Sequence, residues 1–449
     1  MPLMMSVSGV RGVVGETMTP TLAAELGCAF GTYLGGGKVV VGRDTRPSGS
    51  MVQQAVVSGL LAAGCEVVLL EVASTPATAL KVRSHRSGGG VVVTASHNPL
   101  VFNGLKFLTS EGLAPPAQQA GRLFDIYHRK AFKLVDAERI SSPVVEHSAA
   151  TSHVEATLRI LEPEQIAQRR FRVVLDSING AGGAEGELLL QRLGCEAVHT
   201  NAEPSGRFTH PPEPLAENLT GLCDLVREHA AAAGFAQDPD ADRLAIVDET
   251  GRYIGEEYTL ALAARYMFAE RPGPAAVNLS TSRMIDDLAA AAGEPCRVHR
   301  SPVGEANVVA VMKAHGCAFG GEGNGGVIDP RVVPVRDSLV AMGLTLQLMA
   351  GTGKSLSTLV DEIPRYVMIK RKFECSKDRV NRVLALLREK YAREKVNDSD
   401  GLRVDFADCW VHVRGSNTEP IIRIIAEAHT RDRAEELVAA VRGVLDAVA

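Results

Sequence analysis

The sequence is poor in aromatic residues and carries no excess of positive charge. Phe, Trp and Tyr make up 4% of the 449 residues, and the formal net charge is −5 because acidic residues outnumber Lys and Arg. Proteins that bind nucleic acids need clustered positive charge, and those that bind single strands stack the bases on aromatic rings. We therefore expect no nucleic-acid partner. A content of 22% charged and 45% hydrophobic residues indicates an ordinary globular protein.

Long apolar runs and closely spaced cysteine pairs are also missing. No stretch of about 18 uninterrupted apolar residues occurs, so we expect no membrane partner. The segment 1–16 lacks the basic residues and long apolar core of a signal peptide. None of the 8 cysteines forms a C-x-x-C pair. We therefore expect free thiols in a cytoplasmic protein, and neither disulfides nor a zinc site.

Short strand-like runs, each followed by a glycine-rich turn and a helical pattern, recur along most of the chain. The clearest runs are residues 38–41, 172–175 and 275–279. The helical patterns that follow them extend to about residues 63, 193 and 292. Strands that alternate with helices predict parallel sheets with helices packed on them.

The C-terminal segment shows a different pattern. The expected strands are 366–373, 402–406, 409–413 and 421–426, and the expected helices are 377–393 and a last one from about 431. Strands close together in sequence predict an antiparallel sheet. We therefore expect an α/β protein with three consecutive α/β domains, with mixed and mainly parallel sheets, and a C-terminal α+β domain. The predicted domains are 1–150, 151–250, 251–365 and 366–449.

The segment 94–99, T-A-S-H-N-P, directly follows a strand-like run. Ligands bind beyond the carboxyl ends of parallel strands, so Ser96 is a candidate functional residue. A serine needs a base, a metal or prior modification to react. His97 is adjacent, but neighbouring residues of a strand point to opposite faces, so a Ser–His pair is not expected. A polar turn formed by Asn98 and Pro99 is the alternative interpretation.

The segment 238–243, D-P-D-A-D-R, places three carboxylates at alternate positions. Carboxylates so close together repel unless a cation lies among them, and an all-oxygen set suits Mg²⁺, Mn²⁺ or Ca²⁺. A calcium EF-hand is disfavoured because Arg243 stands where that loop needs glycine. A solvated acidic turn is the other alternative. We expect Asp238, Asp240 and Asp242 to bind a divalent metal.

Two further loops carry residues suited to a phosphorylated sugar. The first, 320–326, contains five glycines with Glu322 and Asn324, and a carboxylate can accept hydrogen bonds from two neighbouring hydroxyls. The second, 414–420, offers small hydroxyl side chains and an arginine, which suit an anion. A glycine turn and a plain hairpin are the alternatives. The G-T-G-K-S segment at 351–355 does not fit a P-loop, because Leu348 stands where glycine is required.

Together the four loops supply a serine, a metal site, a hydroxyl-binding carboxylate and a phosphate-binding arginine. Transfer of a phosphoryl group on a sugar requires this combination. We therefore expect the loops to meet in one cleft.

In this order the loops closely resemble the motifs of a known family, the α-D-phosphohexomutases. The family's marks are T-A-S-H-N-P, D-x-D-x-D-R, G-E-x-x-G and R-x-S-x-T-x-P, and the match extends from Arg11 to Arg423. The resemblance implies three α/β domains around a central cleft, with a C-terminal domain similar to the TATA-binding-protein fold.

The resemblance also implies a reaction. Ser96 would carry a phosphoryl group, donate it to a hexose phosphate to give a hexose 1,6-bisphosphate, and take the other phosphoryl group back. The bisphosphate would also serve as activator. Lys106 matches a lysine proposed as general acid or base. The implied catalytic residues are Ser96, Lys106, Arg11, Arg243 and His97; the Mg²⁺ ligands are Ser96, Asp238, Asp240 and Asp242; the substrate-binding residues are Glu322, Asn324, Arg414, Ser416, Asn417, Thr418 and Arg423.

One departure bears on the sugar. Bacterial members usually end the sugar loop in Ser-Gly-His, whereas this sequence has Asn324, Gly325 and Gly326. The phosphate loop resembles that of phosphoglucosamine mutases, so we expect glucosamine phosphate as preferred substrate, with glucose and mannose phosphates as alternatives. A metal-dependent sugar phosphatase and a sugar-phosphate sensor without turnover are the remaining hypotheses. We expect a monomer or a homodimer.

Overall fold

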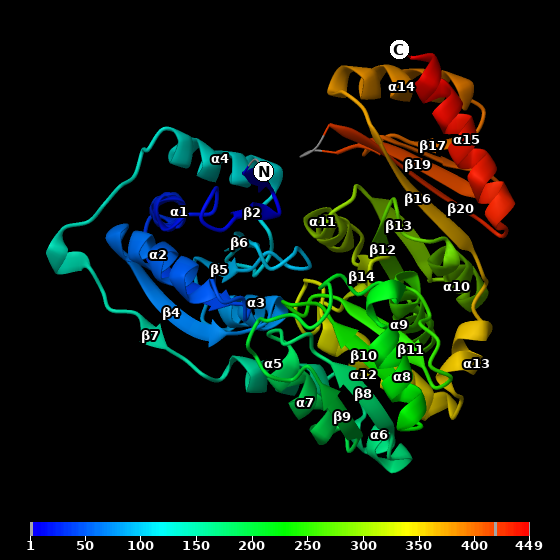
Figure 1. The fold of residues 1–449 in the computed structure, drawn as a ribbon, viewed down its shortest axis with the longest axis horizontal. Coiled ribbons are helices and arrows are strands. Elements are labelled where there is room, and N and C mark those ends of the chain that lie inside the picture. Colours follow the sequence, from blue (N-terminus) through cyan, green and yellow to red (C-terminus); the bar gives the residue numbers. More distant parts are fainter. Residues whose placement is uncertain (1–2, 417–419, 449) are drawn as a thin grey trace. The chain divides into compact units, whose positions relative to one another are not determined.

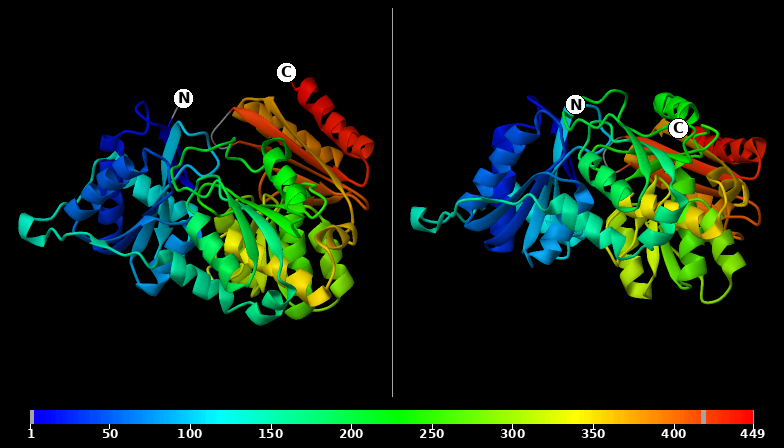
Figure 2. Two further views of the ribbon diagram at one scale, coloured as in Figure 1. Left: turned by 60° about the horizontal axis from the view of Figure 1, so that its bottom comes forward. Right: turned by 90° about the horizontal axis from the view of Figure 1, so that it is seen from below.

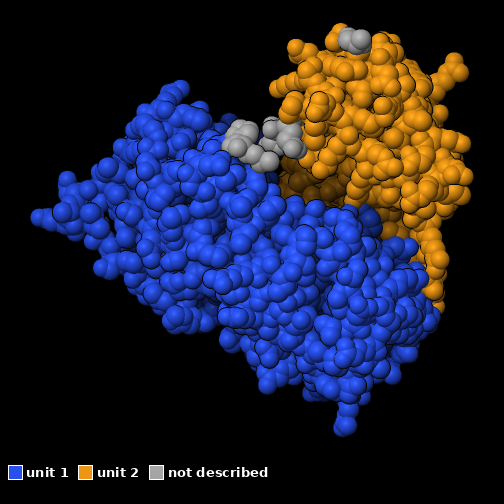
Figure 3. Space-filling model, viewed as in Figure 1, with its two compact units in different colours: residues 1–266, 324–360 blue, residues 267–323, 361–449 orange. Residues whose placement is uncertain are grey.

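The computed structural model describes residues 3–416 and 420–448. The chain folds into two compact units, which Figure 3 shows in different colours. Unit 1 contains residues up to 266 and residues 324–360, and unit 2 contains residues 267–323 and 361–449. The chain passes between the units within α9 (Glu256–Glu270), after β14 (Phe319–Glu322) and within α13 (Leu356–Asp361). This division does not test the predicted domain boundaries, which stay predictions.

The N-terminal part of unit 1 is built on a 7-stranded sheet with the order β1-β2-β6-β5-β3-β4-β7. The sheet is mixed: β3 runs parallel to β4 and β5, while β6 runs antiparallel to β5 and β2. The strands are β1 (Met4–Ser6), β2 (Gly9–Val13), β3 (Gly37–Arg43), β4 (Cys65–Val72), β5 (Gly89–Val93), β6 (Phe102–Thr109) and β7 (Val144–Val145).

Helices cover both faces of this sheet (Figure 1). They are α1 (Pro20–Leu34), α2 (Gly49–Ala62), α3 (Thr75–Ser84) and α4 (Ala117–His128). Thr19 and Ser74 cap α1 and α3 by accepting a backbone hydrogen bond, and a proline follows within the first turn of each helix. A Cβ at Gly89 would meet α1, and one at Gly90 would meet α3. The strand β5 is therefore buried on both sides, as expected for a central strand of such a sheet.

A second sheet of unit 1 has 4 strands in the order β11-β10-β8-β9. Three strands run parallel, and β11 is antiparallel to β10, so the acidic loop 238–243 joins two neighbouring strands. The strands of this sheet and the helices near them are α5 (Ala149–Leu158), α6 (Pro163–Arg169), β8 (Arg172–Asp176), α7 (Gly183–Arg192), β9 (Glu196–Thr200), α8 (Thr220–Glu228), β10 (Ala233–Gln237), β11 (Leu244–Asp248) and α12 (Ser338–Thr352). Unit 1 also contains β15 (Gly326–Ile328), which belongs to a different sheet. Residues 338–350 of α12 are all buried.

Unit 2 contains two kinds of sheet (Figure 2). In the first, β12 (Pro274–Asn278) runs parallel to β13 (Arg297–Ser301) and to β14, and the connecting helices are α10 (Met284–Ala292) and α11 (Glu305–His315). The second is a 5-stranded antiparallel sheet with the order β16-β20-β19-β18-β17. Its elements are β16 (Val367–Glu374), α14 (Lys377–Lys390), β17 (Lys395–Asn397), β18 (Leu402–Asp405), β19 (Trp410–Gly415), β20 (Ile421–Ala428) and α15 (Arg431–Ala447).

The predicted fold class is confirmed, since mixed α/β sheets precede an antiparallel C-terminal sheet with helices. One predicted loop is wrong in part: residues 320–322 belong to β14, and only the residues after them turn. The reason is the close packing of this strand, because a Cβ at Gly320 would lie 2.7 Å from the Ala276 carbonyl oxygen. All eight cysteines are free thiols, as predicted. Among the described residues, no helix combines the length and apolar character needed to cross a bilayer.

His153 is buried between two carboxylates in the interior of unit 1. Its Nδ1 lies 3.0 Å from Glu185 Oε2, and its Nε2 lies 2.7 Å from Asp337 Oδ2. Burial opposes the charge of the imidazole, but Asp337 and Glu185 outweigh it and raise the pKa of His153 to about 10. The charged ring ties α5 and α7 to the start of α12, because Asp337 caps that helix.

Replacing His153 by glutamine is expected to remove a pH-dependent part of the stability. Folding raises the pKa of His153 from 6.5 to about 10, so the contribution of the charged ring is complete below pH 6.5 and is lost as the pH rises toward 10. In urea denaturation, wild type should exceed His153→Gln by roughly 3–5 kcal/mol near pH 6.5, with the gap closing toward pH 10. The exposed His147→Gln is the control. A gap that does not change with pH would contradict this account.

Candidate active site

Ser96 occupies a tight turn directly after β5. Its φ of +50° lies in the left-handed region, which few residues other than glycine adopt. Its N–H donates to Thr94 Oγ1 at 2.9 Å. The turn brings the hydroxyl against the acidic loop, where Ser96 Oγ donates to Asp238 Oδ2 at 3.1 Å. Two predicted site segments, distant in sequence, therefore meet within unit 1.

Arg46 holds the backbone of the serine loop, and the sequence analysis did not select it. Its guanidinium donates to the carbonyl oxygens of Ser96 and Asn98, both at 2.6 Å, and to that of Pro99 at 2.8 Å. Arg46 is buried, and Asp44 Oδ2 accepts from its Nε at 3.1 Å, which compensates the buried charge. A strained turn persists only where its surroundings hold it, and Arg46 supplies that support.

The acidic loop gathers three buried carboxylates. Oxygens of Asp238, Asp240 and Asp242 lie within 4.8 Å of one another. Burial, together with Asp242 and Asp240, raises the pKa of Asp238 well above its ordinary value. Burial also disfavours the charge on Asp242, but Arg336, Lys106 and Arg243 outweigh it and lower the pKa of Asp242. Within the trio, the charged form of Asp238 is therefore disfavoured, whereas that of Asp242 is favoured.

The donor set fits a hard divalent cation. Oδ1 of Asp240 and Oδ1 of Asp242 are buried, and no described residue donates a hydrogen bond to either oxygen. A buried carboxylate oxygen without a partner is costly. A cation among the three aspartates would satisfy both oxygens, and an all-oxygen set suits Mg²⁺ or Mn²⁺.

Positive side chains surround the acidic loop. Lys106 Nζ donates to Asp240 Oδ2 at 2.5 Å and to Asp242 Oδ2 at 3.1 Å. Arg336 Nη2 donates to Asp242 Oδ2 at 2.6 Å, and Arg243 Nε lies 3.8 Å from Asp242 Oδ1. Burial opposes the charge of Lys106, but Asp240 and Asp242 outweigh it and raise the pKa of the lysine. Such a set of cations suits a multiply charged phosphoryl group.

Arg11 and His97 flank the serine loop. Arg11 Nη1 donates to Asn98 Oδ1 at 2.8 Å. The expectation that Ser96 and His97 point apart is wrong, because Ser96 lies beyond the strand in a left-handed conformation and its Oγ is 3.3 Å from His97 Nδ1. Burial, together with Arg243 and Arg11, lowers the pKa of His97 to about 2. The ring is therefore neutral and a poor proton acceptor.

The end of the predicted sugar loop packs on the start of β11, directly after the acidic loop, within unit 1. Leu244 N donates to the Gly325 carbonyl oxygen at 3.0 Å, and a Cβ at Gly325 would lie 2.4 Å from the Leu244 carbonyl oxygen. Asn324 Oδ1 is buried, and no described residue donates a hydrogen bond to it. A Cβ at Gly326 would lie 2.2 Å from Cδ of Arg336. Glycine at 326 therefore makes room for the arginine that reaches the acidic loop.

In unit 2, Glu322 is buried at the end of β14. Its Oε1 accepts hydrogen bonds from Asn278 Nδ2 at 2.8 Å and from Gly304 N at 3.1 Å. The next residue is fixed as well, because Gly323 N donates to Thr281 Oγ1 at 3.1 Å. An oriented carboxylate of this kind can accept hydrogen bonds from a pair of sugar hydroxyls.

The predicted phosphate-binding residues lie on β19, on β20 and between them. Arg414 and Arg423 are directly opposite each other in the ladder, and Lys372 of β16 is opposite Arg423 on the other side. Like charges at such positions repel, so an anion bound there would relieve the repulsion. Arg414 Nε also lies 3.2 Å from Asp400 Oδ2. The remaining predicted residues are Ser416, which follows β19, and Asn417 and Thr418, which lie outside the described residues.

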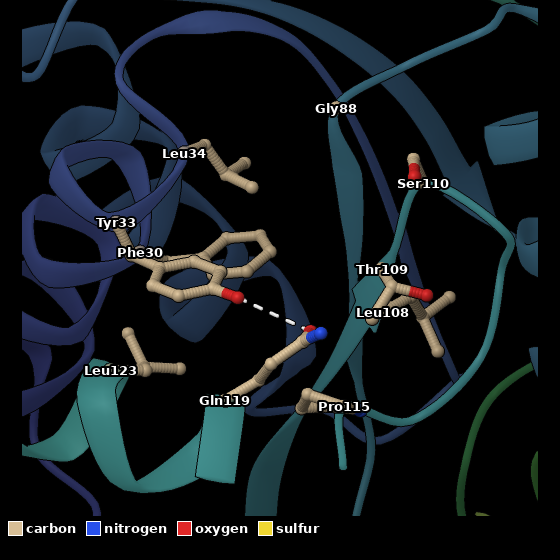
Figure 4. Close-up of a pocket in the computed structure, with 10 residues that line it drawn as sticks. All are labelled: Phe30, Tyr33, Leu34, Gly88, Leu108, Thr109, Ser110, Pro115, Gln119 and Leu123. Carbon is tan, nitrogen blue, oxygen red and sulfur yellow. Dashed lines mark hydrogen bonds between the residues drawn. The ribbon is translucent and has the colours of Figure 1, made fainter.

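A small, mainly apolar pocket in unit 1 does not belong to this site (Figure 4). Side chains of α1 and α4 line it, and Tyr33 OH donates to Gln119 Oε1 at 3.2 Å. The pocket adjoins Gly88, which precedes β5, whereas Ser96 follows the other end of that strand.

Unit 1 thus gathers the serine, the acidic trio and their cations, and unit 2 gathers Glu322 and the paired arginines. Arg46 and Arg336 were missed from the sequence. Arg46 lies in the polar turn after β3, so the rule that selected Ser96 could have found it. No comparable sequence pattern marks Arg336, because the position of its side chain depends on the absence of a side chain at Gly326, ten residues away.

Known proteins are similar to this chain over nearly its whole length. The four domains of the phosphoglucomutase/phosphomannomutase family, namely α/β/α domains I, II and III and the C-terminal domain, match residues 3–134, 151–251, 256–366 and 368–444. A protein of Methanopyrus kandleri named probable phosphoglucosamine mutase is 39% identical over 436 residues, which cover 96% of this chain and 95% of that protein. A phosphoglucomutase/phosphomannomutase of Thermococcus kodakarensis is 38% identical, with 95% of each chain covered.

Solved structures are similar over the same length. A phosphoglucomutase/phosphomannomutase family protein from Burkholderia thailandensis has a TM-score of 0.86 at 27% identity, with 99% of this chain and 98% of that chain covered. A putative phosphomannomutase from Thermus thermophilus has a TM-score of 0.83 at 26% identity, with 99% of each chain covered. With all four domains matched in order and the serine loop in contact with the acidic trio, the chain belongs to the phosphoglucomutase/phosphomannomutase family.

Proposed function

We propose that the protein interconverts hexose 6-phosphate and hexose 1-phosphate through a phosphorylated Ser96 and a hexose 1,6-bisphosphate. The observation that carries the proposal is the hydrogen bond from the Ser96 hydroxyl to Asp238 in a buried acidic trio ringed by cations. A serine placed in this way can accept and release a phosphoryl group, because the surrounding cations stabilise the charge that develops during transfer.

Each half-reaction moves one phosphoryl group. In the first, the free hydroxyl oxygen of the hexose phosphate bonds to phosphorus, the bond between Ser96 Oγ and phosphorus breaks, and the hydroxyl proton ends on Ser96 Oγ. In the second, Ser96 Oγ bonds to the other phosphorus of the bisphosphate, the bond from that phosphorus to the sugar oxygen breaks, and the proton passes to that oxygen. Atoms and charge balance, and the phosphorylated enzyme is restored. Hexose 1,6-bisphosphate would also activate enzyme that has lost its phosphoryl group.

Asp238, Asp240 and Asp242, with an oxygen of phosphorylated Ser96, would hold one Mg²⁺, which when bound would withdraw charge from the phosphoryl group. Arg11 and Arg243 would bind the phosphoryl oxygens. Lys106 would deliver or hold a proton at the sugar oxygen and stabilise negative charge there. His97, which is neutral, would orient the Ser96 side chain. These roles come from the positions and charges described above.

Unit 2 would bind the parts of the substrate that do not react. Glu322 would accept hydrogen bonds from sugar hydroxyls, with Asn324 of unit 1 as a further contact. Arg414 and Arg423, with Ser416, Asn417 and Thr418, would bind the phosphate that is not being transferred. Binding energy from these distant contacts can be used to position the reacting group. The substrate-binding residues would act on the same molecule as Ser96.

Glucosamine phosphate is the proposed preferred substrate, and glucose and mannose phosphates are the alternatives. Relatives at 35–39% identity named probable phosphoglucosamine mutase favour the first, and the 38% identical phosphoglucomutase/phosphomannomutase favours the others. Coupled assays on glucosamine 6-phosphate, glucose 1-phosphate and mannose 1-phosphate rank the three. Release of inorganic phosphate without isomerisation would indicate a phosphatase instead.

Replacing Ser96 by alanine is expected to remove the acceptor of the phosphoryl group and to lower kcat by about a thousandfold or more. The exposed Ser142→Ala is the matched control and should keep wild-type turnover. Mass spectrometry of active wild type should find a peptide spanning 94–99 heavier by one phosphoryl group. Substantial mutase activity in Ser96→Ala would contradict the assignment.

Replacing Asp240 by asparagine is expected to weaken Mg²⁺ binding about tenfold or more, because the trio loses one charged ligand. Isothermal titration with MgCl₂ should give one site per chain in wild type and in the control Asp224→Asn, whose side chain is 72% exposed. Chelation should stop turnover and Mg²⁺ should restore it. Equal Mg²⁺ affinity in Asp240→Asn and wild type would count against the site.

Replacing Gly326 by alanine is expected to displace Arg336 from Asp242, since the new methyl group would lie 2.2 Å from Cδ of the arginine. The kcat should fall about a hundredfold, as for loss of one charge-stabilising donor, and Arg336→Met should show a similar fall. Gly121→Ala, with nothing within 4 Å of its Cβ position, is the control. Wild-type kcat in Gly326→Ala would refute this role of Arg336.

A further inference from the structure

Glu322 and Arg414 of unit 2 are linked through a single intervening side chain, that of Asp400. Gly304 N donates to Glu322 Oε1 at 3.1 Å. The preceding N–H, that of Val303, donates to Asp400 Oδ2 at 3.0 Å. Arg414 Nε lies 3.2 Å from the same carboxylate oxygen and 3.3 Å from the other. The backbone of one residue, Val303, and one carboxylate thus connect the proposed sugar-binding group to the proposed phosphate-binding group.

A second path closes this connection into a ring through His412. His412 Nε2 donates to the Asp400 carbonyl oxygen at 2.7 Å, because a carbonyl oxygen only accepts, and Nδ1 therefore accepts from Ser280 Oγ at 2.9 Å. Burial lowers the pKa of His412 to about 4, so the ring is neutral in this tautomer. Ser280 N donates to Asn278 Oδ1 at 2.8 Å, and Asn278 Nδ2 donates to Glu322 Oε1 at 2.8 Å.

The backbone around Asp400 is fixed by contacts other than the ion pair between Asp400 and Arg414. Gly401 has a φ of +73°, and a Cβ there would lie 2.2 Å from the Val413 carbonyl oxygen, so the turn needs glycine. Beyond the turn, Arg403 Nη1 donates to the Leu279 carbonyl oxygen at 2.5 Å. The loop that carries Asp400 is therefore anchored to the segment after β12.

We propose that Asp400 is a positioning residue that fixes the separation between Arg414 and Glu322, so that the protein selects phosphosugars by the span from the phosphate to a pair of hydroxyls. The inference rests on the proposed function, because it assigns Glu322 to the sugar and Arg414 to the phosphate. Groups held at the correct separation before binding lose less freedom when the ligand arrives, which increases affinity. A shorter polyol phosphate, such as glycerol phosphate, would then bind less well than a hexose phosphate, because it would not reach both groups at once.

The test compares Asp400→Asn with Asp398→Asn in the full-length protein. Asparagine keeps the size of the side chain and removes the charge that holds Arg414. Asp398 belongs to the same loop and pairs with Arg388 on the surface, with its side chain 61% exposed, so it is a matched control. For the best of the three hexose phosphates, Asp400→Asn should raise KM about tenfold with kcat changed less than about threefold, because binding of non-reacting parts is lost. Asp398→Asn should stay within about twofold of wild type.

A double-mutant cycle with Glu322→Gln separates positioning from a merely structural role. If Asp400 sets the separation, Glu322→Gln should lower kcat/KM about tenfold in wild type and less than about threefold in Asp400→Asn, because in the second background Arg414 is no longer held at the matching distance from residue 322. Equal factors in the two backgrounds would overturn the proposal, since a structural role would leave the two effects independent.

A second variant covers the case in which Asp400→Asn does not fold. Asp400→Glu keeps the charge and adds one methylene, which moves Arg414 relative to Glu322. It should raise KM for the hexose phosphate severalfold at an unchanged melting temperature, and an unchanged KM would overturn the proposal. Failure of the proposed function has a different signature, because wild type and Asp398→Asn would then both fail to isomerise any of the three hexose phosphates.

Discussion

Three carboxylates buried within 4.8 Å of one another are the constraint on which unit 1 depends. Their mutual repulsion must be balanced, and Lys106, Arg243 and Arg336 approach them with positive charge. The hydrogen bond from Ser96 to Asp238 places the Ser96 turn beside the same acidic loop that these cations approach. The proposed transfer of a phosphoryl group to Ser96 would use the same arrangement of cations that compensates the charge of the acidic loop.

In unit 2, a hydrogen-bonded ring connects the two proposed binding groups. Glu322 at the end of β14 and Arg414 on β19 come from different sheets, yet Asp400 and His412 connect them. A site that binds the non-reacting part of a ligand needs a fixed distance between its binding groups more than it needs additional charge. The action of the two units on one substrate molecule stays a prediction.

The sequence predicted much of this arrangement because the chemistry lies where strands end. Ser96, the three aspartates and Glu322 all lie at or just beyond the carboxyl end of a strand, where ligands bind in such sheets. The side-chain relationship of Ser96 and His97 could not be predicted by strand alternation, since Ser96 adopts a positive φ. Arg336 and Asp400 were missed because each acts through partners that only folding brings near. Asn417 and Thr418 lie outside the described residues, so their predicted role stays a prediction.

On the proposed mechanism, Ser96 passes its phosphoryl group to a sugar and not to water. The most direct measurement uses wild-type protein labelled with ³²P at Ser96 and mixed with an unlabelled hexose phosphate in the presence of Mg²⁺. We expect the label to leave the protein and to be recovered in hexose 1,6-bisphosphate before it appears in hexose monophosphate. Label released directly as inorganic phosphate, or label that stays on the protein, would contradict it.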